Sequence, residues 1–426
     1  MSSRILVLGA GGREHALAWR LARDPEAPEV IVAPGNDGMA RQFRRLALRD
    51  TDPAAVVAAA RAEDVSLVVV GPEAPLAAGV SDALVAAGIV VSGASQAAAQ
   101  LESSKWFAKQ VMREAGVPTA RAERFSELAA ALAALERFGP PWVVKADGLA
   151  AGKGVLVSRD RAETETFVTD CLEGGRFGDG GRCVVLEEHL SGEEASVLAV
   201  CDGERHLLLP AARDYKRALD DDRGPNTGGM GSYAPTPAIT PELERTVSDQ
   251  VFTPVLRTMA ARGTPYRGTL YAGLMLTAAG PRVIEFNARF GDPETQSVLP
   301  LLSGSLSALL ASAARGRLEP AAVARSAQAA VTLALAADGY PDRVRAGGVI
   351  RGLDALRDVL VFHAGTALEA GEWVVRGGRA AYLTAVDHSI GAARARVYAA
   401  HAALSGSGWR SRGDIAVGAE HSARVG

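Results

Sequence analysis

The first hundred residues alternate short runs of β-forming residues with alanine-rich stretches. The β-forming runs occupy residues 5–8, 30–33, 67–70 and 89–92, and the stretches between them are typical of helices. Strands that alternate with helices in this way are the signature of a parallel sheet. We therefore predict an N-terminal parallel α/β domain over residues 1–103.

The middle of the chain begins with one longer helical stretch. Residues 102–115 are predicted to form a helix that ends at Gly116 and Pro118, so residues 104–120 are expected to bridge to a second unit. That unit, a lid subdomain at 121–190, has strands in "PWVVKADGLAAGKGVLV" and "RCVVLEEHL" and helical stretches at 126–138 and 161–172.

The second half of the chain is predicted to form mainly sheet at first and then a mixture of helices and strands. Residues 195–313 predict mainly sheet within a central subdomain at 191–325, and "RALDDDRGPNTGGMGSYAP" interrupts it as a long loop. A long loop inside a compact domain is usually functional or disordered. Residues 326–426, with a helix near 390–404, predict a small C-terminal α+β domain. The predicted fold class is therefore α/β and α+β multidomain, with a core of two α+β units between the terminal domains.

Composition narrows the classes of partner. The chain has 426 residues, 48% hydrophobic and 22% charged, and its formal charge of -3 leaves no footprint for nucleic acid. Cys171, Cys183 and Cys201 lack metal-ligand spacing and fit a reducing compartment. We find no signal peptide and no run of about 18 apolar residues, and we expect a cytoplasmic protein that binds small molecules and no membrane.

A glycine-rich turn, "GAGGREHA", follows the first predicted strand and opens a helix, whose amides and dipole can hold a phosphate. A dinucleotide-binding turn needs a third glycine where Glu14 stands, and an acid after the second strand, where "VAPGN" stands. We therefore favour a phosphate-bearing substrate, or simply tight strand-to-helix packing, over NAD.

A second glycine-rich segment, "GLAAGKG" at 148–154, differs from a P-loop. It has three residues instead of four before Gly-Lys, and Gly154 stands where Ser or Thr is required. It lies between two apparent strands, so it is predicted to be a flexible hairpin flap that approaches phosphate oxygens, with charge from Lys145 and Lys153. A mobile surface hairpin would explain the glycines but not a lysine within "WVVKAD".

The segment "VIEFNARFGDPE" at 283–294 combines an apolar strand with several charges. In a regular strand Glu285, Asn287 and Arg289 share one face. Ile284 and Phe286 belong to the other face, which is predicted to pack inward. Burying a carboxylate is costly unless it is paired or binds a metal, although a half-exposed strand with a solvated polar face is a common alternative.

These segments, in this order, resemble an ATP-grasp ligase: Lys105, Lys145 before a glycine flap, the hinge "LEEHLSGEEAS" and the strand "IEFNARF". With "GNDG", "GPEAPL", "GPNTGGMGSYAP", "YAGLM" and "RFGDPETQ", the whole chain resembles the glycinamide ribonucleotide synthetase family. The resemblance implies an enzyme that joins glycine to phosphoribosylamine with ATP and magnesium or manganese, through glycyl phosphate, in purine biosynthesis.

The resemblance also implies roles at the nucleotide. Lys105, Lys145, Gly152, Lys153 and Gly154 would contact the phosphates; Glu187, Glu188 and Leu190 would meet adenine; Glu194 would accept from the ribose; Glu285 and Asn287 would bind the metal. Arg289 would stabilise charge on the transferring phosphoryl group.

At the acceptor substrate, Asp214 would hold the amino group of glycine. The three catalytic candidates are Arg289, Asp214 and Lys216. The substrate-binding candidates are Gly11, Gly12, Asn226, Thr227, Gly228, Gly229, Met230, Asp292 and Glu294. Either the 5-phosphate is expected to meet the N-terminal glycine turn, or residues 292–294 are expected to orient the ribose of phosphoribosylamine. Transient contact with the preceding pathway enzyme is also expected.

Two alternatives stay open. An ATP-grasp ligase for another carboxylate and amine is conceivable because "ARDYKR" departs from the usual family sequence. A nucleotide-binding module without catalysis is disfavoured by the combination of Glu285, Asn287 and Arg289, because a binder has no need to stabilise a transferring phosphoryl group.

Overall fold

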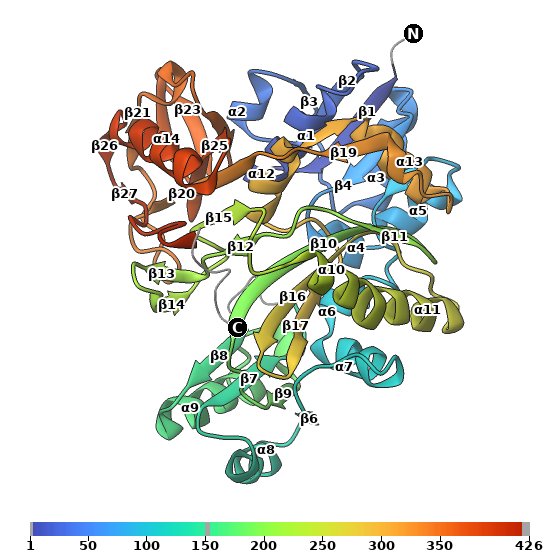
Figure 1. Ribbon diagram of the computed structural model, residues 1–426, viewed down its shortest axis with the longest axis vertical. Coiled ribbons are helices and arrows are strands. Elements are labelled where there is room, and N and C mark those ends of the chain that lie inside the picture. Colours follow the sequence, from blue (N-terminus) through green and yellow to red (C-terminus); the bar gives the residue numbers. More distant parts are fainter. Residues whose placement is uncertain (1–2, 150–153, 420–426) are drawn as a thin grey trace.

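The computed structural model describes residues 3–149 and 154–419. Its N-terminal part is a five-stranded parallel sheet in the order β3-β2-β1-β4-β5, as the alternation predicted (Figure 1). The strands are β1 (Arg4–Gly9), β2 (Glu29–Pro34), β3 (Arg44–Arg45), β4 (Leu67–Val70) and β5 (Val91–Ser92). The helices are α1 (Gly12–Leu21), α2 (Asp37–Ala40), α3 (Pro53–Ala62), α4 (Glu73–Ala77), α5 (Val80–Ala86) and α6 (Gln100–Ser103).

The helix predicted at 102–115 is interrupted at Ser104. This residue has extended backbone angles, φ −134° and ψ 115°, and its side chain accepts from the amide of Phe107 at the start of α7 (Lys105–Glu114). Asp147 Oδ1 accepts from Ser104 Oγ (2.8 Å) and from Trp106 N (3.0 Å). A serine favours a helix cap over a helix interior, so the break places Lys105 in the first turn of α7.

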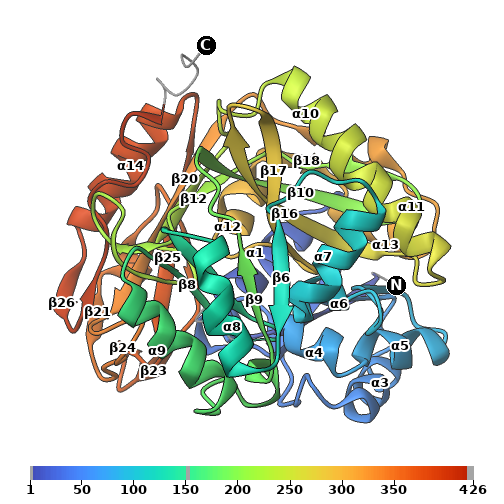
Figure 2. The ribbon, with the colours of Figure 1, turned by 90° about the horizontal axis from the view of Figure 1, so that it is seen from below.

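The lid is a four-stranded antiparallel sheet that projects from the rest of the molecule (Figure 1). Its elements are β6 (Ala122–Phe125), α8 (Leu128–Ala134), β7 (Trp142–Ala146), β8 (Val155–Ser158), α9 (Arg161–Leu172) and β9 (Val184–Glu187). Figure 2 shows α8 and α9 side by side over one face of this sheet. Strands β7 and β8 pair antiparallel, so the predicted hairpin is confirmed. Gly152 and Lys153 lie outside the described residues.

The central sheet has the order β11-β10-β16-β17. Its strands are β10 (Glu193–Asp202), β11 (His206–Leu208), β16 (Arg267–Thr277) and β17 (Gly280–Asn287). The prediction of mainly sheet over 195–313 is wrong where α10 (Pro241–Val247), a π-helical turn (Ser248–Phe252), α11 (Thr253–Ala261), α12 (Glu294–Val298) and α13 (Leu306–Ala314) form. Buried Val247, Val251, Val255 and Met259 recur at intervals of four, the spacing of a helix face.

The last part of the chain forms two sheets. One has the order β12-β15-β20-β25-β22, and β27 also pairs with β20; the other has the order β23-β24-β21-β26. The elements are β12 (Arg213–Asp214), β15 (Gly231–Ala234), β20 (Ala329–Ala337), β21 (Val349–Arg351), β22 (Leu360–His363), β23 (Thr366–Glu369), β24 (Glu372–Val375), β25 (Arg379–Asp387), α14 (Ile390–Ala402), β26 (Ser405–Ser407) and β27 (Trp409–Arg410). Strands β12 and β15 therefore extend the sheet of the last hundred residues.

The long loop predicted at "RALDDDRGPNTGGMGSYAP" is largely ordered structure. It forms a hairpin of β13 (Arg217–Leu219) and β14 (Arg223–Asn226), followed by strand β15. Asp221 and Asp222 take positive φ at the turn, 58° and 50°, a conformation that Asp tolerates better than most residues. A second short antiparallel pair is formed by β18 (Leu302–Gly304) and β19 (Val323–Arg325).

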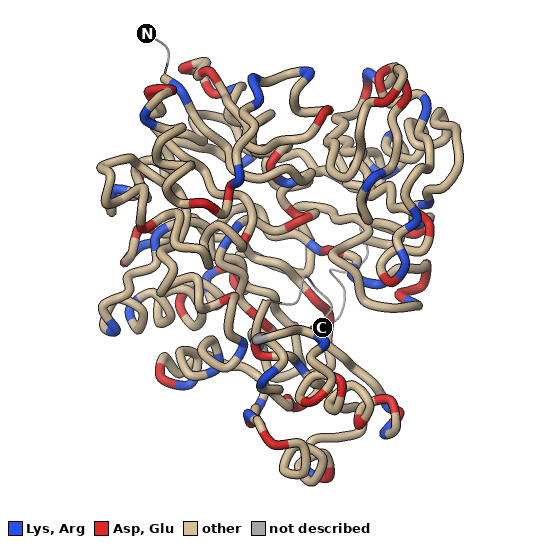
Figure 3. Tube along the Cα trace, turned by 180° about the vertical axis from the view of Figure 1, so that it is seen from behind, with Lys and Arg blue, Asp and Glu red and all other residues tan. Residues whose placement is uncertain are grey.

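Charges of both signs are interspersed along the chain (Figure 3). Within the described residues, no helix combines the length and apolarity that crossing a membrane requires.

A buried ion pair ties the first helix to the start of α13, and its loss is the first testable change. Asp24 pairs with Arg20 (2.7 Å) and accepts from the amides of Leu306 and Ser307. Because Asp24→Ala leaves a buried guanidinium without its partner, we expect the free energy of unfolding in urea to fall by about 3–5 kcal/mol. The exposed Asp354→Ala is the control and should cost under about 1 kcal/mol; equal losses would contradict the assignment.

Candidate active site

A cavity of about 730 Å³ lies where the lid, the central sheet and the two terminal parts meet. The candidate residues that line it are Lys105, Lys145, Gly154, Glu187, Glu188, Leu190, Glu194, Asp214, Lys216, Asn226, Thr227, Gly228, Glu285, Asn287, Arg289, Asp292 and Glu294. Gly11, Gly12, Gly229 and Met230 are not part of this lining. Most of the residues predicted from separate motifs thus face one space.

A β-bulge in β17 corrects the predicted side-chain alternation. Gly273 on β16 faces Glu285, but the next residue, Leu274, faces Val283, so Ile284 is the extra residue. Val283 and Phe286 are fully buried, whereas Ile284 lines the cavity together with Glu285. The prediction that Ile284 packs inward is therefore wrong, because the bulge turns two successive side chains toward the site.

The bulge leaves a carbonyl that the lid uses. Lys145 Nζ, on β7, donates to Ile284 O (2.9 Å) and pairs with Glu187 Oε2 (3.1 Å). Lys109 Nζ, on α7, pairs with the same Glu187 oxygen (3.1 Å), and burial lowers the pKa of Lys109 to about 8. An ammonium has three donors, so the two contacts of Lys145 leave one N–H for a ligand in the cavity.

Glu285 and Asn287 present oxygen atoms to the cavity. Burial alone would raise the pKa of Glu285, but Lys105, Lys216 and Lys145 outweigh burial and bring it to about 2. Lys105 Nζ lies 3.4 Å from Glu285 Oε2. In the amide orientation that satisfies its neighbours, the nitrogen of Asn287 donates to Phe286 O and to Glu102 Oε1, and its oxygen is then the atom left to accept a cation. An ionised carboxylate and an amide oxygen are ligands that magnesium prefers.

Arg289 is held by two acids from the N-terminal part. Its Nη2 lies 3.0 Å from Glu102 Oε1 and its Nε lies 3.5 Å from Glu73 Oε2. Glu102 also accepts from the amide of Ala288 (2.7 Å), and burial raises the pKa of its carboxyl. The guanidinium is therefore fixed before any substrate arrives, which is the condition for electrostatic stabilisation without reorganisation.

Asp214 and Lys216 form the other end of the cavity. Burial raises the pKa of Asp214 to about 7, with Lys216 opposing and Glu294 adding to the rise. Lys216 Nζ pairs with Glu194 Oε2 (3.1 Å). Ser196 Oγ lies 3.0 Å from Glu294 Oε1 and 3.4 Å from Asp214 Oδ1, so one hydroxyl lies beside both acids. This group of acids suits a small cationic ligand.

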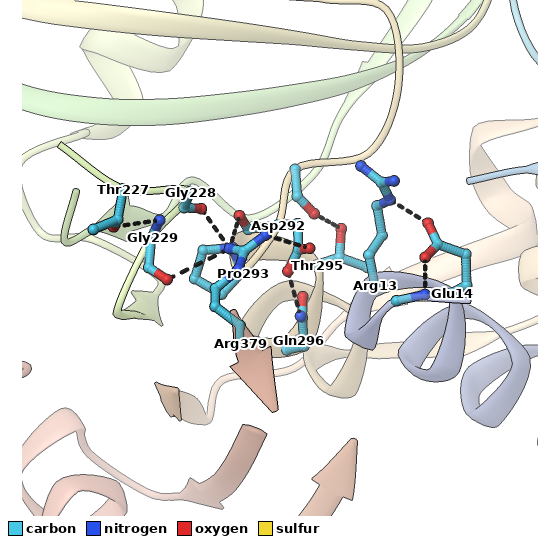
Figure 4. A network of polar contacts seen from close by, with 12 residues as sticks. Arg13, Glu14, Thr227, Gly228, Gly229, Asp292, Pro293, Thr295, Gln296 and Arg379 are labelled. Carbon is cyan, nitrogen blue, oxygen red and sulfur yellow. Dashed lines mark hydrogen bonds and ion pairs between the residues drawn. The ribbon is translucent and has the colours of Figure 1, made fainter. Parts of the chain in front are cut away.

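The N-terminal glycine turn encloses a side chain of its own. Glu14 accepts from the amide of Gly11 (2.7 Å) and pairs with Arg13, as Figure 4 shows. A Cβ added at Gly71 would lie 2.2 Å from Glu14 Oε1, so glycine there makes room for this carboxylate. The helix terminus thus carries an internal anion, and Arg13 is the residue of the turn that lines the cavity.

The loop of residues 226–230, predicted to bind the acceptor substrate and called the acceptor loop below, is fixed by the C-terminal part. The amide of Gly228 donates to Tyr340 Oη (2.9 Å), and its carbonyl accepts from Arg379 Nη1. Arg379 also pairs with Asp292 Oδ2 (2.8 Å), while Gln296 donates to Asp292 Oδ1 (2.7 Å) (Figure 4). Both oxygens of Asp292 are therefore engaged within the protein.

Sequence reasoning missed several residues of this lining, among them Arg13, Glu73, Glu102, Tyr271 and Arg379. Arg13, Glu73 and Tyr271 stand in the motifs "GAGGREHA", "GPEAPL" and "YAGLM", and Glu102 begins the helix predicted at 102–115, so their chain positions offered a signal. Arg379 has no local signal, because it reaches the cavity only through the pairing of β25 with β20 and the contact with residue 292.

Comparison with known proteins supports the family resemblance along nearly the whole chain. Family models for phosphoribosylglycinamide synthetase match in order: the N domain at 3–102, the ATP-grasp (A) domain at 103–295 and the C domain at 330–418. A phosphoribosylamine–glycine ligase of Caulobacter vibrioides is 47% identical over 415 residues, 96% of this chain and 97% of that protein. One from Xanthomonas axonopodis pv. citri is 48% identical over 417 residues, 97% of each.

Solved structures give the same answer. Phosphoribosylamine–glycine ligase of Thermotoga maritima superposes with a TM-score of 0.83 at 33% identity, covering 97% of this chain and all of that one. The biotin carboxylase domain of Hydrogenobacter thermophilus 2-oxoglutarate carboxylase, at 16% identity and a TM-score of 0.72, covers 96% of this chain and 91% of that one, and shares the fold.

The fold and the cavity define an ATP-grasp enzyme, in which a lid sheet and a central sheet enclose the site. The order and coverage of the three family matches then settle the particular group. The chain belongs to the phosphoribosylglycinamide synthetase family, the phosphoribosylamine–glycine ligases of purine biosynthesis.

The pKa of Asp214 provides a test of this geometry that needs no activity. Lys216 lowers that pKa in the native site, so Lys216→Met should raise it above about 7. The change is measured by pH titration of the aspartate carboxyl carbons in NMR, with Asp214→Asn to assign the signal. The exposed Arg223→Met, in the neighbouring hairpin, should leave the value unchanged; an unchanged or lower value for Lys216→Met would contradict the geometry.

Proposed function

We propose that this chain joins glycine to 5-phosphoribosylamine with ATP, through glycyl phosphate, and releases glycinamide ribonucleotide, ADP and phosphate. One observation carries the proposal: a single cavity holds fixed cations and the Glu285–Asn287 oxygens beside the Asp214–Lys216 pair and the acceptor loop. A ligase must bring the phosphate donor and the acceptor substrate close enough for their reacting atoms to form a bond, so both sets of residues have to face the same cavity.

The nucleotide half is assigned to the space between the sheets. The free N–H of Lys145 and the ammonium of Lys105 would contact phosphate oxygens, with Gly154 at the base of the flap. The hinge residues Glu187, Glu188 and Leu190 would meet adenine, and Glu194 would accept from the ribose.

The metal assignment rests on the ionised Glu285 and the outward oxygen of Asn287. Among the described residues, no cluster of three His, Cys, Asp or Glu side chains is placed to chelate a metal. Magnesium would thus be held by these two residues with phosphate oxygens and water, and it would neutralise phosphate charge. Manganese in the same place stays a prediction.

The chemistry consists of two displacements. A carboxylate oxygen of glycine bonds to the γ-phosphorus as the bond to ADP breaks, and Arg289 stabilises the charge on the moving phosphoryl group. The amine of phosphoribosylamine then bonds to the glycyl carbonyl carbon, phosphate leaves with its electron pair, and the nitrogen gives a proton to phosphate or a nearby carboxylate. Asp214 would hold the ammonium of glycine, and Lys216 would fix the adjoining negative charge.

Phosphoribosylamine is assigned to the space beside the acceptor loop, residues 226–230. Its 5-phosphate would meet the N-terminal turn, where Arg13, next to Gly11 and Gly12 in the chain, lines the cavity. Glu294 would contact the sugar more readily than Asp292, because Arg379 and Gln296 occupy both Asp292 oxygens. Transient contact with the enzyme that supplies this unstable amine stays a prediction.

A glycine-dependent assay tests the reaction. With ATP, magnesium and freshly generated phosphoribosylamine, ADP release should require glycine, and alanine or serine should give little turnover. ATP binding without any glycine-dependent ADP release would overturn the proposal and favour the alternative, an ATP-grasp ligase for another carboxylate and amine.

Lys145→Met tests the nucleotide assignment. Loss of a charged hydrogen bond to phosphate should raise the Michaelis constant for ATP by about tenfold or more, measured at saturating glycine. Arg161→Met removes an exposed cation from the same lid and should have no such effect. An unchanged ATP Michaelis constant for Lys145→Met would remove the assignment.

A further inference from the structure

Lysine is rare in this chain, and three of its lysines line the cavity. The sequence contains 41 arginines but five lysines, and all five lie between residues 105 and 216. Lys105, Lys145 and Lys216 line the cavity. Lys153 is outside the described residues. Arginine therefore supplies cations almost everywhere else. The proposed function gives Lys109 no role, so this lysine needs an account of its own.

Lys109 is buried and all three of its N–H groups have acceptors. Its Nζ donates to Thr119 Oγ1 (2.8 Å) and Ala120 O (3.1 Å), and it pairs with Glu187 Oε2 (3.1 Å). These acceptors belong to the segment after α7 and to β9 of the lid. A compact ammonium satisfies three convergent acceptors, whereas the planar fork of a guanidinium is larger and directs its donors within one plane.

The pairing leaves one oxygen of Glu187 free. Lys109 and Lys145 share Oε2, while the fully buried Oε1 has no hydrogen-bond partner among the described residues. A buried acceptor without a donor is costly, and the Glu187 side chain lines the cavity. The unused oxygen therefore points to a donor supplied by the ligand.

We infer that Lys109 is a positioning residue that acts through Glu187, holding its Oε2 so that Oε1 accepts a hydrogen bond from an N–H donor on the nucleotide base. The inference rests on the proposed function for the identity of the nucleotide. It adds a requirement that charge alone does not meet: an arginine at position 109 keeps the charge but not the three-acceptor geometry.

Discrimination between two nucleotides tests the inference. ATP has an amino group at the position where inosine triphosphate has a carbonyl oxygen, so a fixed acceptor favours ATP. Binding of each nucleotide with magnesium is measured by calorimetry, without acceptor substrates. The wild type should prefer ATP by about tenfold or more, and both Lys109→Met and Lys109→Arg should reduce that preference by about fivefold or more.

A double variant shows whether Lys109 acts through Glu187. Glu187→Gln should also weaken the preference, and adding Lys109→Met to it should change the preference little further. Arg113→Met, on the exposed side of the same helix, is the control and should retain the full preference. Thr119→Val, which removes one acceptor and keeps the charge, decides the question by a loss of about twofold or more if Lys109→Met does not fold.

Two outcomes of these binding experiments would contradict different parts of the inference. A wild type that binds both nucleotides equally would contradict the adenine contact of Glu187 itself, whatever the ligase assay shows. A wild type that prefers ATP, with the preference intact in Lys109→Arg and in Thr119→Val, would overturn the role of Lys109 and leave the proposed ligase function standing.

Discussion

The lid and the central sheet are joined by a hydrogen bond from Lys145 Nζ to the carbonyl of Ile284, and the shape of the cavity depends on this contact. The carbonyl is available because Ile284 is the extra residue of a bulge and has no partner opposite it on β16. The same bulge turns Glu285 toward the cavity. One local irregularity of β17 thus supplies an anchor for the lid and a carboxylate for the site.

Other charged side chains of the cavity are held by direct contacts with residues that are far away in the sequence. Two acids of the N-terminal part fix Arg289, and Arg379 of β25 fixes Asp292 and the acceptor loop. Each of these groups is largely shielded from solvent and lies beside its partner, since an isolated buried charge would be far too costly. The site is therefore assembled by packing of all parts of the chain, and the folded protein presents it with its charges already paired.

The sequence was sufficient to predict the parallel N-terminal sheet and the hairpin of β7 and β8, and most of the predicted site residues do line the cavity, because each belongs to a short motif with its own spacing. Three features could not be predicted from the sequence, because each depends on contacts between separate parts of the chain. The bulge at Ile284 is a property of two paired strands, and the contact of Arg379 depends on long-range packing. Ser104 interrupts a helix because Asp147, more than forty residues away, accepts from the first turn of α7.

Strand β15, which follows the acceptor loop, and its partner β12 are hydrogen-bonded into the sheet built by the last hundred residues. The half of the cavity that we propose for the nucleotide has no such dependence, because its strands belong to the lid and the central sheet. The two halves of the cavity are thus carried by separate sheets. Evolution of a new acceptor in this architecture would remodel the C-terminal sheet and its loop, while the machinery that activates the carboxylate could persist unchanged.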